Sequence, residues 1–436
     1  MMICYAVEMA KKAGMDDAVA KLVSRKEKQI KFHKSEISTI KEWEEITLEM
    51  FMAKGKKNFM LVFENPDRKR VGKAIRDGEG IIKLLSPKER YHGLGENEKK
   101  YVDKKKYDEN IDDERKILSL ANKTIDDALK HAEEVAGIIY AGKETINICS
   151  SRGINENDKN SWITLSTRAF SSDKASGHAV QCSRTLKSIK KNAGKEAGKI
   201  AEMALHPKKI ERGKYDIIFS HLSFANLISY MAVLSSAFYV DSGMSFLAGK
   251  MKKNIGSENI TLIDSGIHPD GIASRKFDDE GLATGETVIV DKGQLKSYLH
   301  NTSTAYSHKT KTTGNAGIIY PSPWNEVVMP GDVSLEEMLE GVERGIYVTN
   351  VWYTRFQNYM TGDFSTIARD GAFFVEDGAI SYPVEGIRIS DNMLRILKNV
   401  KLLSNDSRQI CWWEVEVPTF TPQVLIKNVN ITRSFM

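Results

Sequence analysis

Residues 217–240 read IIFSHLSFANLISYMAVLSSAFYV, and this stretch has no acidic or basic residue other than His221, although 28% of the 436 residues are charged. Its length would allow a membrane span, because about 20 apolar residues cross a bilayer. Polar side chains would then lie in lipid, namely Ser220, Ser223, Asn226, Ser229, Ser235 and Ser236. We therefore interpret the stretch as part of the core of a globular protein.

The same stretch predicts a buried strand followed by a buried helix. The strand covers residues 215–220, and Ser223 is a candidate N-cap because its hydroxyl can accept a free N–H of the first turn. The apolar residues of the helix recur at helical spacing and comprise Leu227, Ile228, Met231 and Leu234. A zinc-protease helix carries two His residues with a Glu directly after the first, whereas this helix offers Ile, Ser and Val. We predict a core helix without catalytic groups.

The composition is that of a soluble globular protein. The chain is long enough for two or three domains, and 41% of its residues are hydrophobic. The net charge of +5, from 63 basic and 58 acidic residues, indicates neither a dedicated nucleic-acid surface nor a membrane surface. The four cysteines form no CxxC motif and are typical of free thiols in a reducing compartment. The N-terminus does not resemble a signal peptide, so we expect a cytoplasmic protein.

The order of helix-like and strand-like segments predicts an α+β fold with two domains. Residues 1–210 would form an N-terminal α/β domain with an antiparallel meander and helices, in two parts joined by a charged connection near residues 86–115. Residues 211–436 would form a C-terminal, mainly antiparallel β domain with one buried helix. Glycine turns at residues 291–293 and 376–378 indicate β-hairpins there, because glycine readily adopts positive φ.

The N-terminal domain is predicted in more detail from its apolar patterns. Strand-like runs cover residues 18–24, 29–33 and 46–53, behind a helix over residues 3–13. Two further helices are expected, at residues 113–137 and at residues 188–205, where Ala193, Ala197 and Ala201 would allow close packing. Residues 86–115 are polar and charge-dense, which predicts a surface connection with partial disorder.

Residues 53–76 contain more basic than acidic side chains. A nucleic-acid patch and a solvated helix face are both open interpretations, and the sparse aromatic residues favour the solvated face. Sequence motifs for dinucleotides, P-loop phosphates and the serine-hydrolase elbow are missing from the chain, as are the HxH and HExxH patterns.

Two clusters in the C-terminal half could carry chemistry. Asp278, Asp279 and Glu280 precede Gly281, and a metal or acid–base role would require them to converge in a cleft. The alternative is a solvated turn. Residues 313–317, TGNAG, offer small side chains and backbone donors that could bind a peptide backbone or an anion, and a plain turn is again the alternative.

The C-terminal half resembles the TldD/PmbA family of DNA gyrase modulators and peptide-processing metalloproteases. The resemblance lies in FDDEG (277–281), GQLKSYL (293–299), TGNAG (313–317), TGDFS (361–365) and DGAISYPVEG (377–386). It implies a cleft for an extended peptide. Its candidate residues are Asp278, Asp279, Glu280, Thr313, Gly314, Asn315, Gly317, Gly362 and Asp363.

The family has two branches, which the resemblance implies work together as a hetero-oligomer. The TldD branch carries HExxxH on the helix after the domain boundary, where the motif would occupy positions 228–233 of this sequence, with a late cysteine completing a zinc site. Ile228, Ser229 and Val233 occupy the ligand and glutamate positions, and Cys411 would remain a lone thiol. The chain is therefore similar to the PmbA (TldE) branch, and we expect no metal, no other cofactor and no catalytic residue.

These observations lead to three functional hypotheses. The first is a metal-free subunit that acts on extended peptides with a zinc-bearing TldD-type homologue, or as a homodimer. Trp352, Tyr353 and Phe356 are candidate anchors of that interface, unless they pack in the protein's own core. The second is an independent peptidase with an unrecognised site. The third is a gyrase- or nucleic-acid-associated binding protein, which the charge balance does not favour.

Overall fold

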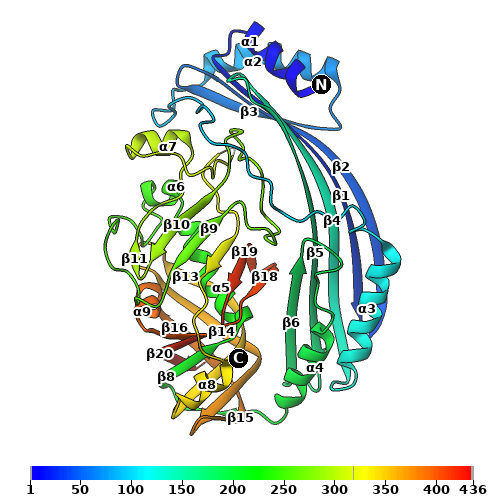
Figure 1. The fold of residues 1–436 in the computed structure, drawn as a ribbon, viewed down its shortest axis with the longest axis vertical. Helices are drawn as coiled ribbons and strands as arrows, with labels where there is room; N and C mark the ends of the chain where they lie inside the picture. The colour runs from blue at the N-terminus through cyan, green and yellow to red at the C-terminus, as the bar shows by residue number, and fades with distance from the viewer. Residues whose placement is uncertain (1, 318, 434–436) are drawn as a thin grey trace.

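The computed structural model describes residues 2–317 and 319–433 and shows two halves. A long, curved antiparallel sheet forms the N-terminal half, and two further sheets around a buried helix form the C-terminal half (Figure 1). The predicted α+β fold with a mainly antiparallel β C-terminal half is confirmed.

The N-terminal sheet has the strand order β3-β2-β1-β4-β5-β6. Its strands are β1 (Asp17–His33), β2 (Glu36–Lys54), β3 (Lys57–Glu64), β4 (Glu134–Ser150), β5 (Asn155–Phe170) and β6 (Ser176–Ser183). The two short strands expected at 18–24 and 29–33 are one strand, β1. The charged residues between them stay in the sheet because they pair with neighbours, as Arg25 does with Glu144 at 2.9 Å and Lys26 with Glu42 at 3.0 Å.

Helices pack against the sheet at both ends (Figure 1). They are α1 (Met2–Lys12), α2 (Arg68–Leu84), α3 (Glu114–Ala128) and α4 (Ala193–Met203). The small residues of α4 do allow close packing, since Ala193, Ala197 and Ala201 are buried against α3 and the sheet. The helix predicted over 113–137 ends at Ala128, because the chain must turn to begin β4 at Glu134.

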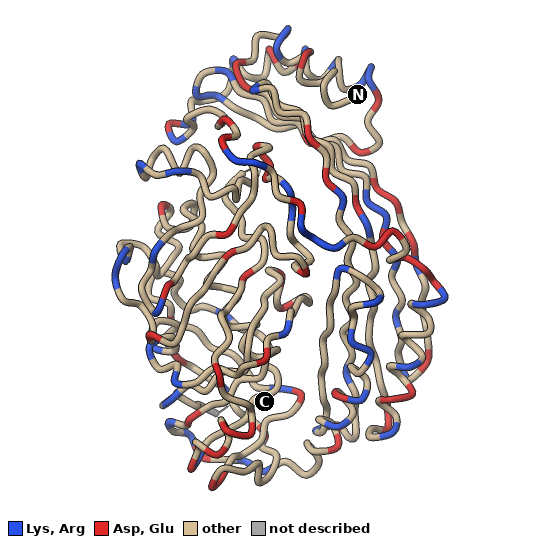
Figure 2. Tube along the Cα trace, viewed as in Figure 1, with Lys and Arg blue, Asp and Glu red and all other residues tan. Residues whose placement is uncertain are grey.

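Residues 85–113 form an ordered segment, here called the strap, that runs between the two halves. It has no regular secondary structure, and about half of its residues are exposed, as expected for a surface connection, while others pack between the two halves. Figure 2 shows its basic residues beside the N-terminal strands. The Lys105 side chain is only 4% exposed and lies 2.5 Å from Asp158 of β5, and the Tyr101 hydroxyl donates to the Gly281 carbonyl at 2.8 Å. These two contacts tie the strap to both halves, although most of its charged side chains are exposed.

The C-terminal half contains two sheets. One has the order β11-β10-β9-β12-β19-β18, and the other has the order β13-β8-β20-β16-β14-β15-β7, with β17 beside β20. Because β13 also pairs with β14, five strands of the second sheet close into a ring. The strands are β7 (Lys208–Lys209), β8 (Gly213–Phe219), β9 (Leu262–Ser265), β10 (Glu286–Asp291), β11 (Gln294–Leu295), β12 (Glu326–Val328), β13 (Arg344–Asn358), β14 (Asp363–Glu376), β15 (Ala379–Glu385), β16 (Ile387–Asn392), β17 (Val400–Leu403), β18 (Arg408–Trp412), β19 (Val415–Thr421) and β20 (Val424–Arg433).

Short helices connect these strands, and the glycine turns lie where the sequence places them. The helices are α5 (His221–Leu234), α6 (Ala237–Asp241), α7 (Thr302–Ser307), α8 (Leu335–Glu340) and α9 (Met393–Lys398). Gly293 joins β10 to β11 with a φ of 77°, and Gly378 joins β14 to β15 with a φ of 80°. Both predicted hairpins are therefore present.

The uncharged stretch divides into β8, α5 and α6, and α5 lies between the two C-terminal sheets. Leu227, Met231 and Leu234 are buried in the main core, as predicted. The N-cap is Ser220, whose Oγ accepts the Ser223 N–H at 3.2 Å, and not Ser223 itself. The helix begins earlier than expected because β8 ends at Phe219 and the chain turns at once. No helix in the described ranges is long and apolar enough to cross a bilayer.

Candidate functional site

The helix α5 carries the positions at which the family's zinc motif would stand. Ile228 is buried in the core and, like Val233, has no atom that can bind a metal. The Ser229 hydroxyl lies 3.4 Å from the Asn226 carbonyl of its own helix. Protein zinc sites use nitrogen, sulfur and carboxylate oxygen ligands. These residues therefore do not fit zinc, and within residues 2–317 and 319–433 no cluster of His, Cys, Asp and Glu is arranged to hold a metal ion.

Cys411 lies on β18, which packs against the first turns of α5. Ile410 and Trp412 of this strand contact Leu222 and Ala225 of the helix. Burial raises the pKa of the Cys411 thiol to about 12, so it stays protonated at neutral pH. Because the thiolate is the form that binds metals and attacks electrophiles, the setting favours a packing role for Cys411.

The turn that follows Phe277 is built around Asp278. Its Oδ1 accepts the backbone N–H groups of Glu280 at 3.0 Å and Leu282 at 2.9 Å. Its Oδ2 accepts the N–H of Ala316 at 3.0 Å. Asp278 is buried, and that burial raises its pKa well above the usual range. Asp278 thus joins the 278–282 turn to residues 313–317, two segments that the sequence separates by more than thirty positions.

Residues 313–315 use their polar groups inside the protein. The Asn315 amide donates to Asp264 Oδ2 at 2.6 Å and to the Ser322 carbonyl at 3.0 Å. Thr313 Oγ1 accepts the His300 N–H at 2.8 Å. Gly314 has a φ of 74°, and a Cβ there would lie 2.5 Å from the Ala283 carbonyl oxygen, so only glycine fits. These three residues shape the loop, and the following Gly317 reaches a cavity.

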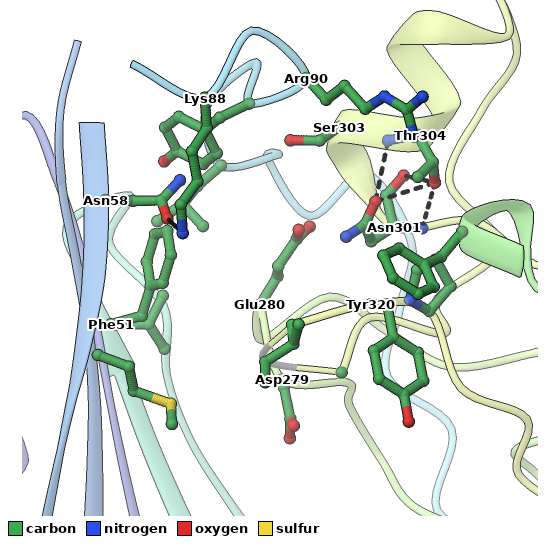
Figure 3. A pocket seen from close by; sticks show the side chains of 18 of the residues that line it. Phe51, Asn58, Lys88, Arg90, Asp279, Glu280, Asn301, Ser303, Thr304 and Tyr320 are labelled. Atoms are coloured by element: carbon green, nitrogen blue, oxygen red, sulfur yellow. Dashed lines mark hydrogen bonds between the residues drawn. The ribbon is translucent and has the colours of Figure 1, made fainter. Parts of the chain in front are cut away.

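A cavity of about 540 Å³ lies between the N-terminal sheet, the strap and the C-terminal half. Figure 3 shows Asp279 and Glu280 between the strand residues Phe51 and Asn58 on one side and Tyr320 on the other. Of the predicted cleft residues, Asp279, Glu280 and Gly317 line this cavity. They are the part of the predicted site that the structure brings together.

The two carboxylates of the cavity differ in their partners. Asp279 Oδ1 lies 2.7 Å from the Lys21 ammonium of β1, which also lies 2.8 Å from Glu49 of β2. Glu280 instead accepts the backbone N–H of Thr302 at 3.3 Å and the hydroxyl of the same residue. Burial raises the pKa of Glu280 to about 7, although these hydrogen bonds oppose the rise. A carboxyl that titrates near neutrality in a cavity can transfer a proton or bind a cation.

Gly362 and Asp363 lie elsewhere, at the turn between β13 and β14. Asp363 is exposed and accepts hydrogen bonds from the Thr361 hydroxyl at 2.5 Å and the Asn392 amide at 2.8 Å. Gly362 has a φ of 86° and packs against Phe246. Neither residue lines the 540 Å³ cavity.

Several residues of the cavity were not among the sequence candidates. Lys21, Glu49 and Phe51 come from the long N-terminal strands, and Tyr91 comes from the strap. The alternation of β2 could have indicated that Glu49 and Phe51 share a face. It could not indicate that this face meets a C-terminal turn more than two hundred residues later.

The C-terminal half matches a known family. Residues 212–433 match the family described as PmbA/TldA metallopeptidase C-terminal domain. A relative from Buchnera aphidicola subsp. Acyrthosiphon pisum, named Metalloprotease PmbA homolog, is 29% identical over 307 residues, which are 68% of this chain and 66% of the relative. A protein from Methanothermobacter thermautotrophicus, named Metalloprotease, is 31% identical over 223 residues, 49% of this chain and 48% of the relative. The chain spans about half to two thirds of the length of these curated relatives.

Solved structures share the whole fold. A Thermotoga maritima protein described as a candidate modulator of a DNA gyrase superposes with a TM-score of 0.89 at 24% identity, over 98% of both chains. TldE from Thermococcus kodakarensis superposes with a TM-score of 0.88 at 21% identity, again over 98% of both chains. At these identities the likeness concerns the fold.

Proposed function

Since the chain belongs to the PmbA/TldD metallopeptidase family, we propose that it is a metal-free, PmbA/TldE-like subunit that acts with a zinc-bearing TldD-type homologue on extended peptides. The observation that carries this proposal is the chemistry of α5. Ile228, Ser229 and Val233 offer no zinc ligand set, while Asp279, Glu280 and Gly317 of the family motifs still line a cavity. A chain that keeps such a cavity without the metal helix is best suited to hold a peptide for a partner.

In this proposal the two subunits divide the work. The homologue's zinc would polarise the scissile carbonyl and activate water. The present chain would bind and orient the peptide. An extended peptide can add as a strand to the edge of a sheet, and β3 is the outermost described strand on the side of the N-terminal sheet where Asn58, Phe59 and Met60 reach the cavity.

The test is co-expression with a zinc-bearing homologue, followed by sizing, metal analysis and a casein-cleavage assay. We expect the chain alone to purify with far less than one zinc per chain and to leave casein intact. We expect the mixture to elute as one complex that cleaves casein faster than the homologue alone. Tight stoichiometric zinc in the isolated chain, or a homologue that ignores it in both sizing and activity, would refute the proposal.

A surface for that partner can be suggested from the aromatic group around β13. Trp352 and Phe356 are half-buried, with Phe356 packed against Tyr230 and Phe246 of the protein's own core. Tyr353 is 46% exposed, and Trp413 on the adjoining turn is 57% exposed. Stable interfaces are enriched in such aromatic residues. We therefore assign the partner contact to Tyr353 and Trp413, whether the partner is the homologue or a second copy of this chain.

An independent peptidase is the second candidate, and Glu280 is the observation that favours it. A carboxyl with a pKa of about 7 could serve as a general base without a metal. In that case the purified chain would cleave unfolded peptides by itself, and Glu280→Gln would abolish the cleavage. Cleavage that occurs only when the homologue is added would favour the partner-subunit proposal over the independent peptidase.

A further inference from the structure

One wall of the 540 Å³ cavity is an apolar row that crosses three strands. Val19 of β1 lies opposite Phe51 of β2, which in turn lies opposite Met60 of β3. The Tyr91 ring of the strap extends this row, 5.7 Å from the ring of Phe51. Because residues directly opposite on antiparallel strands point to the same face, the row forms a continuous apolar surface toward the cavity.

The facing wall is aromatic and comes from the C-terminal half. The rings of Phe238 in α6 and Tyr320 stack with centroids 5.1 Å apart. Figure 3 places Tyr320 across the cavity from Phe51, with Glu280 between them. A ligand that fills this cavity would therefore need an apolar group against the Phe51 and Tyr320 walls and, close to it, a polar group that faces Glu280.

The polar groups around Glu280 leave its carboxylate without a cation. Asp279 is paired with Lys21 at 2.7 Å, and Asp17 is paired with Arg152 at 2.9 Å. Glu280 receives only the N–H and the hydroxyl of Thr302, and no Lys, Arg or His of the described residues lies within ion-pair distance of it. Among the carboxylates that line the cavity, Glu280 is thus the one with no cationic group of the described residues within ion-pair distance.

The basic residues at the rim do not fill this role. Lys88 donates to Asn58 Oδ1 at 2.7 Å, and the Arg90 guanidinium reaches the Asp241 carbonyl at 3.4 Å. In Figure 3 the end of the Lys88 side chain lies at Asn58, and Arg90 extends away from Glu280. The charge that suits the interior of the cavity is therefore positive.

We propose that this cavity binds the amino end of an extended peptide with an apolar first residue, the α-ammonium group at the Glu280 carboxylate and the first side chain against the Phe51 and Tyr320 walls. This inference rests on the proposed peptide function and names the feature of the peptide that this chain would recognise. The volume suits a few residues, since ligand cavities of about 300–1,000 Å³ enclose most of a small ligand.

Other cations fit the site less well. A divalent metal ion prefers six or more oxygen ligands, and Asp279, which lines the cavity beside Glu280, already bears the Lys21 ammonium. A lysine ammonium is strongly hydrated and has a pKa of about 10.4, whereas an α-ammonium has a pKa of about 8 and carries its apolar side chain on the adjacent carbon. That adjacency matches a carboxylate set directly between two apolar walls.

Proton linkage provides an independent signature. The groups that face Glu280 are Asp17 of β1, Asp278 and Asp279 of its own turn, Tyr91 of the strap and Thr302 of α7. With a pKa of about 7, Glu280 is partly protonated at neutral pH and must lose that proton to pair with an ammonium group. Affinity should therefore rise from about pH 6 to about pH 7.5 and fall again as the α-ammonium deprotonates near pH 8.

The test is calorimetric titration of the full purified chain, without a homologue. The probes are a synthetic hexapeptide with an amino-terminal leucine, its N-acetylated form, and an acetylated form that contains one internal lysine. We expect the free-amine peptide to bind at least about 10-fold more tightly than either acetylated peptide, because a charge-assisted contact is lost. We expect Glu280→Gln to weaken the free-amine peptide by a similar factor.

Glu89→Gln is the matched control, because Glu89 also lines the cavity but is exposed and pairs with Lys56 at 2.5 Å. It should bind the free-amine peptide within about 2-fold of the unmodified chain. If Glu280→Gln does not fold, the inference is still tested on the unmodified chain, by comparing its affinities for the free-amine and N-acetylated peptides and by the pH dependence of the affinity.

Equal affinity for free and acetylated peptides, preference for the internal lysine, or no measurable binding would each overturn the inference. Binding with the expected preference but no complex with the homologue would support the cavity's role and overturn only the partner-subunit proposal.

Discussion

Arg168 of β5 and Asp370 of β14 form an ion pair that joins the N-terminal sheet to the C-terminal half, with Arg168 Nε donating to Asp370 Oδ1 at 3.0 Å. The Asp370 side chain is fully buried and also accepts hydrogen bonds from the Ser176 hydroxyl at 2.8 Å and the Asn350 amide at 3.0 Å. The pair thus joins the same two halves that form the walls of the cavity, although neither of its residues lines the cavity.

Replacing Arg168 by Ala should lower the free energy of unfolding by about 3–5 kcal/mol, because it leaves the Asp370 carboxylate buried without a cation. Urea denaturation followed by circular dichroism measures the loss. Arg369→Ala is the control: its guanidinium lies 4.7 Å from the same Trp352 ring that Arg168 approaches at 4.9 Å, but it is exposed and forms no ion pair with the residues that the structure describes. We expect about 1 kcal/mol or less for the control. Similar losses in both variants would contradict a special role for the ion pair.

Shortening buried side chains of the helix α5 should also lower the stability of the protein. Leu227→Ala and Leu234→Ala should each lower the free energy of unfolding by about 2–5 kcal/mol, since both remove buried methyl groups and leave a cavity. Leu84→Ala makes the same chemical change at a side chain that is 88% exposed and should have almost no effect. Denaturation midpoints of the three variants at one pH provide the comparison. Core variants that match Leu84→Ala would place α5 outside the core.

The sequence could predict α5 and the two hairpins because their signals are local. Apolar residues at helical spacing mark the helix, and Gly293 and Gly378 stand where positive φ is needed. The exact cap could not be predicted, because Ser220 and Ser223 are both good N-caps and the end of β8 decides between them.

The cavity could be predicted only in part. Asp279 and Glu280 were identified from their motif, but Lys21 and Phe51 reach them through pairing between distant parts of the chain. The strap is largely exposed, as predicted, but its contacts through Lys105 and Tyr101 could not be predicted, because their partners lie far along the sequence. The division of the chain at residue 210 into two domains stays a prediction.

A buried acid pair should make stability depend on pH. Glu326 of β12 lies opposite Asp264 of β9, and neither oxygen of Glu326 has a hydrogen-bond partner among the described residues. Burial, and then the Asp264 carboxyl, raise the pKa of Glu326 well above its usual range. In the folded protein Glu326 stays protonated at pH values where it is ionised in the unfolded chain. The stability that this protonation provides is fully present below the unfolded pKa of about 4.3. As the pH rises from there toward the folded pKa, the free energy of unfolding falls by up to about 1.4 kcal/mol per pH unit.

Glu326→Gln should remove the Glu326 part of this dependence, because an amide does not titrate, while Asp264, whose pKa burial raises to about 7, keeps its own part. We expect the variant to gain stability relative to the unmodified chain as the pH rises from about 5 to about 8. Urea denaturation at several pH values measures the difference. Glu286→Gln, at an exposed position on the neighbouring β10, is the control and should leave the pH profile unchanged. A parallel profile for Glu326→Gln would mean that Glu326 is already ionised in the fold.

The last prediction concerns the proposed partner surface around Tyr353. Tyr353 has a φ of 56°, a strained conformation for an aromatic residue, at a register shift of β13 between Trp352 and Arg355. Such a bulge turns a side chain out of a strand, and here it exposes Tyr353, whose ring, like that of Trp413, lies against the Trp352 ring.

A stable complex buries roughly 1,600 Å² and often depends on a few aromatic anchors. The double variant Tyr353→Ala and Trp413→Ala should therefore dissociate the mixed complex with the zinc-bearing homologue at least about 10-fold more readily, with an unchanged thermal midpoint. Tyr306→Ala, at an aromatic residue that is 67% exposed near the strap, controls for loss of any exposed ring. Light scattering after size exclusion at decreasing concentrations reports the dissociation. A double variant that assembles like Tyr306→Ala would assign the interface to another surface, and one that unfolds early would show that these rings support the core.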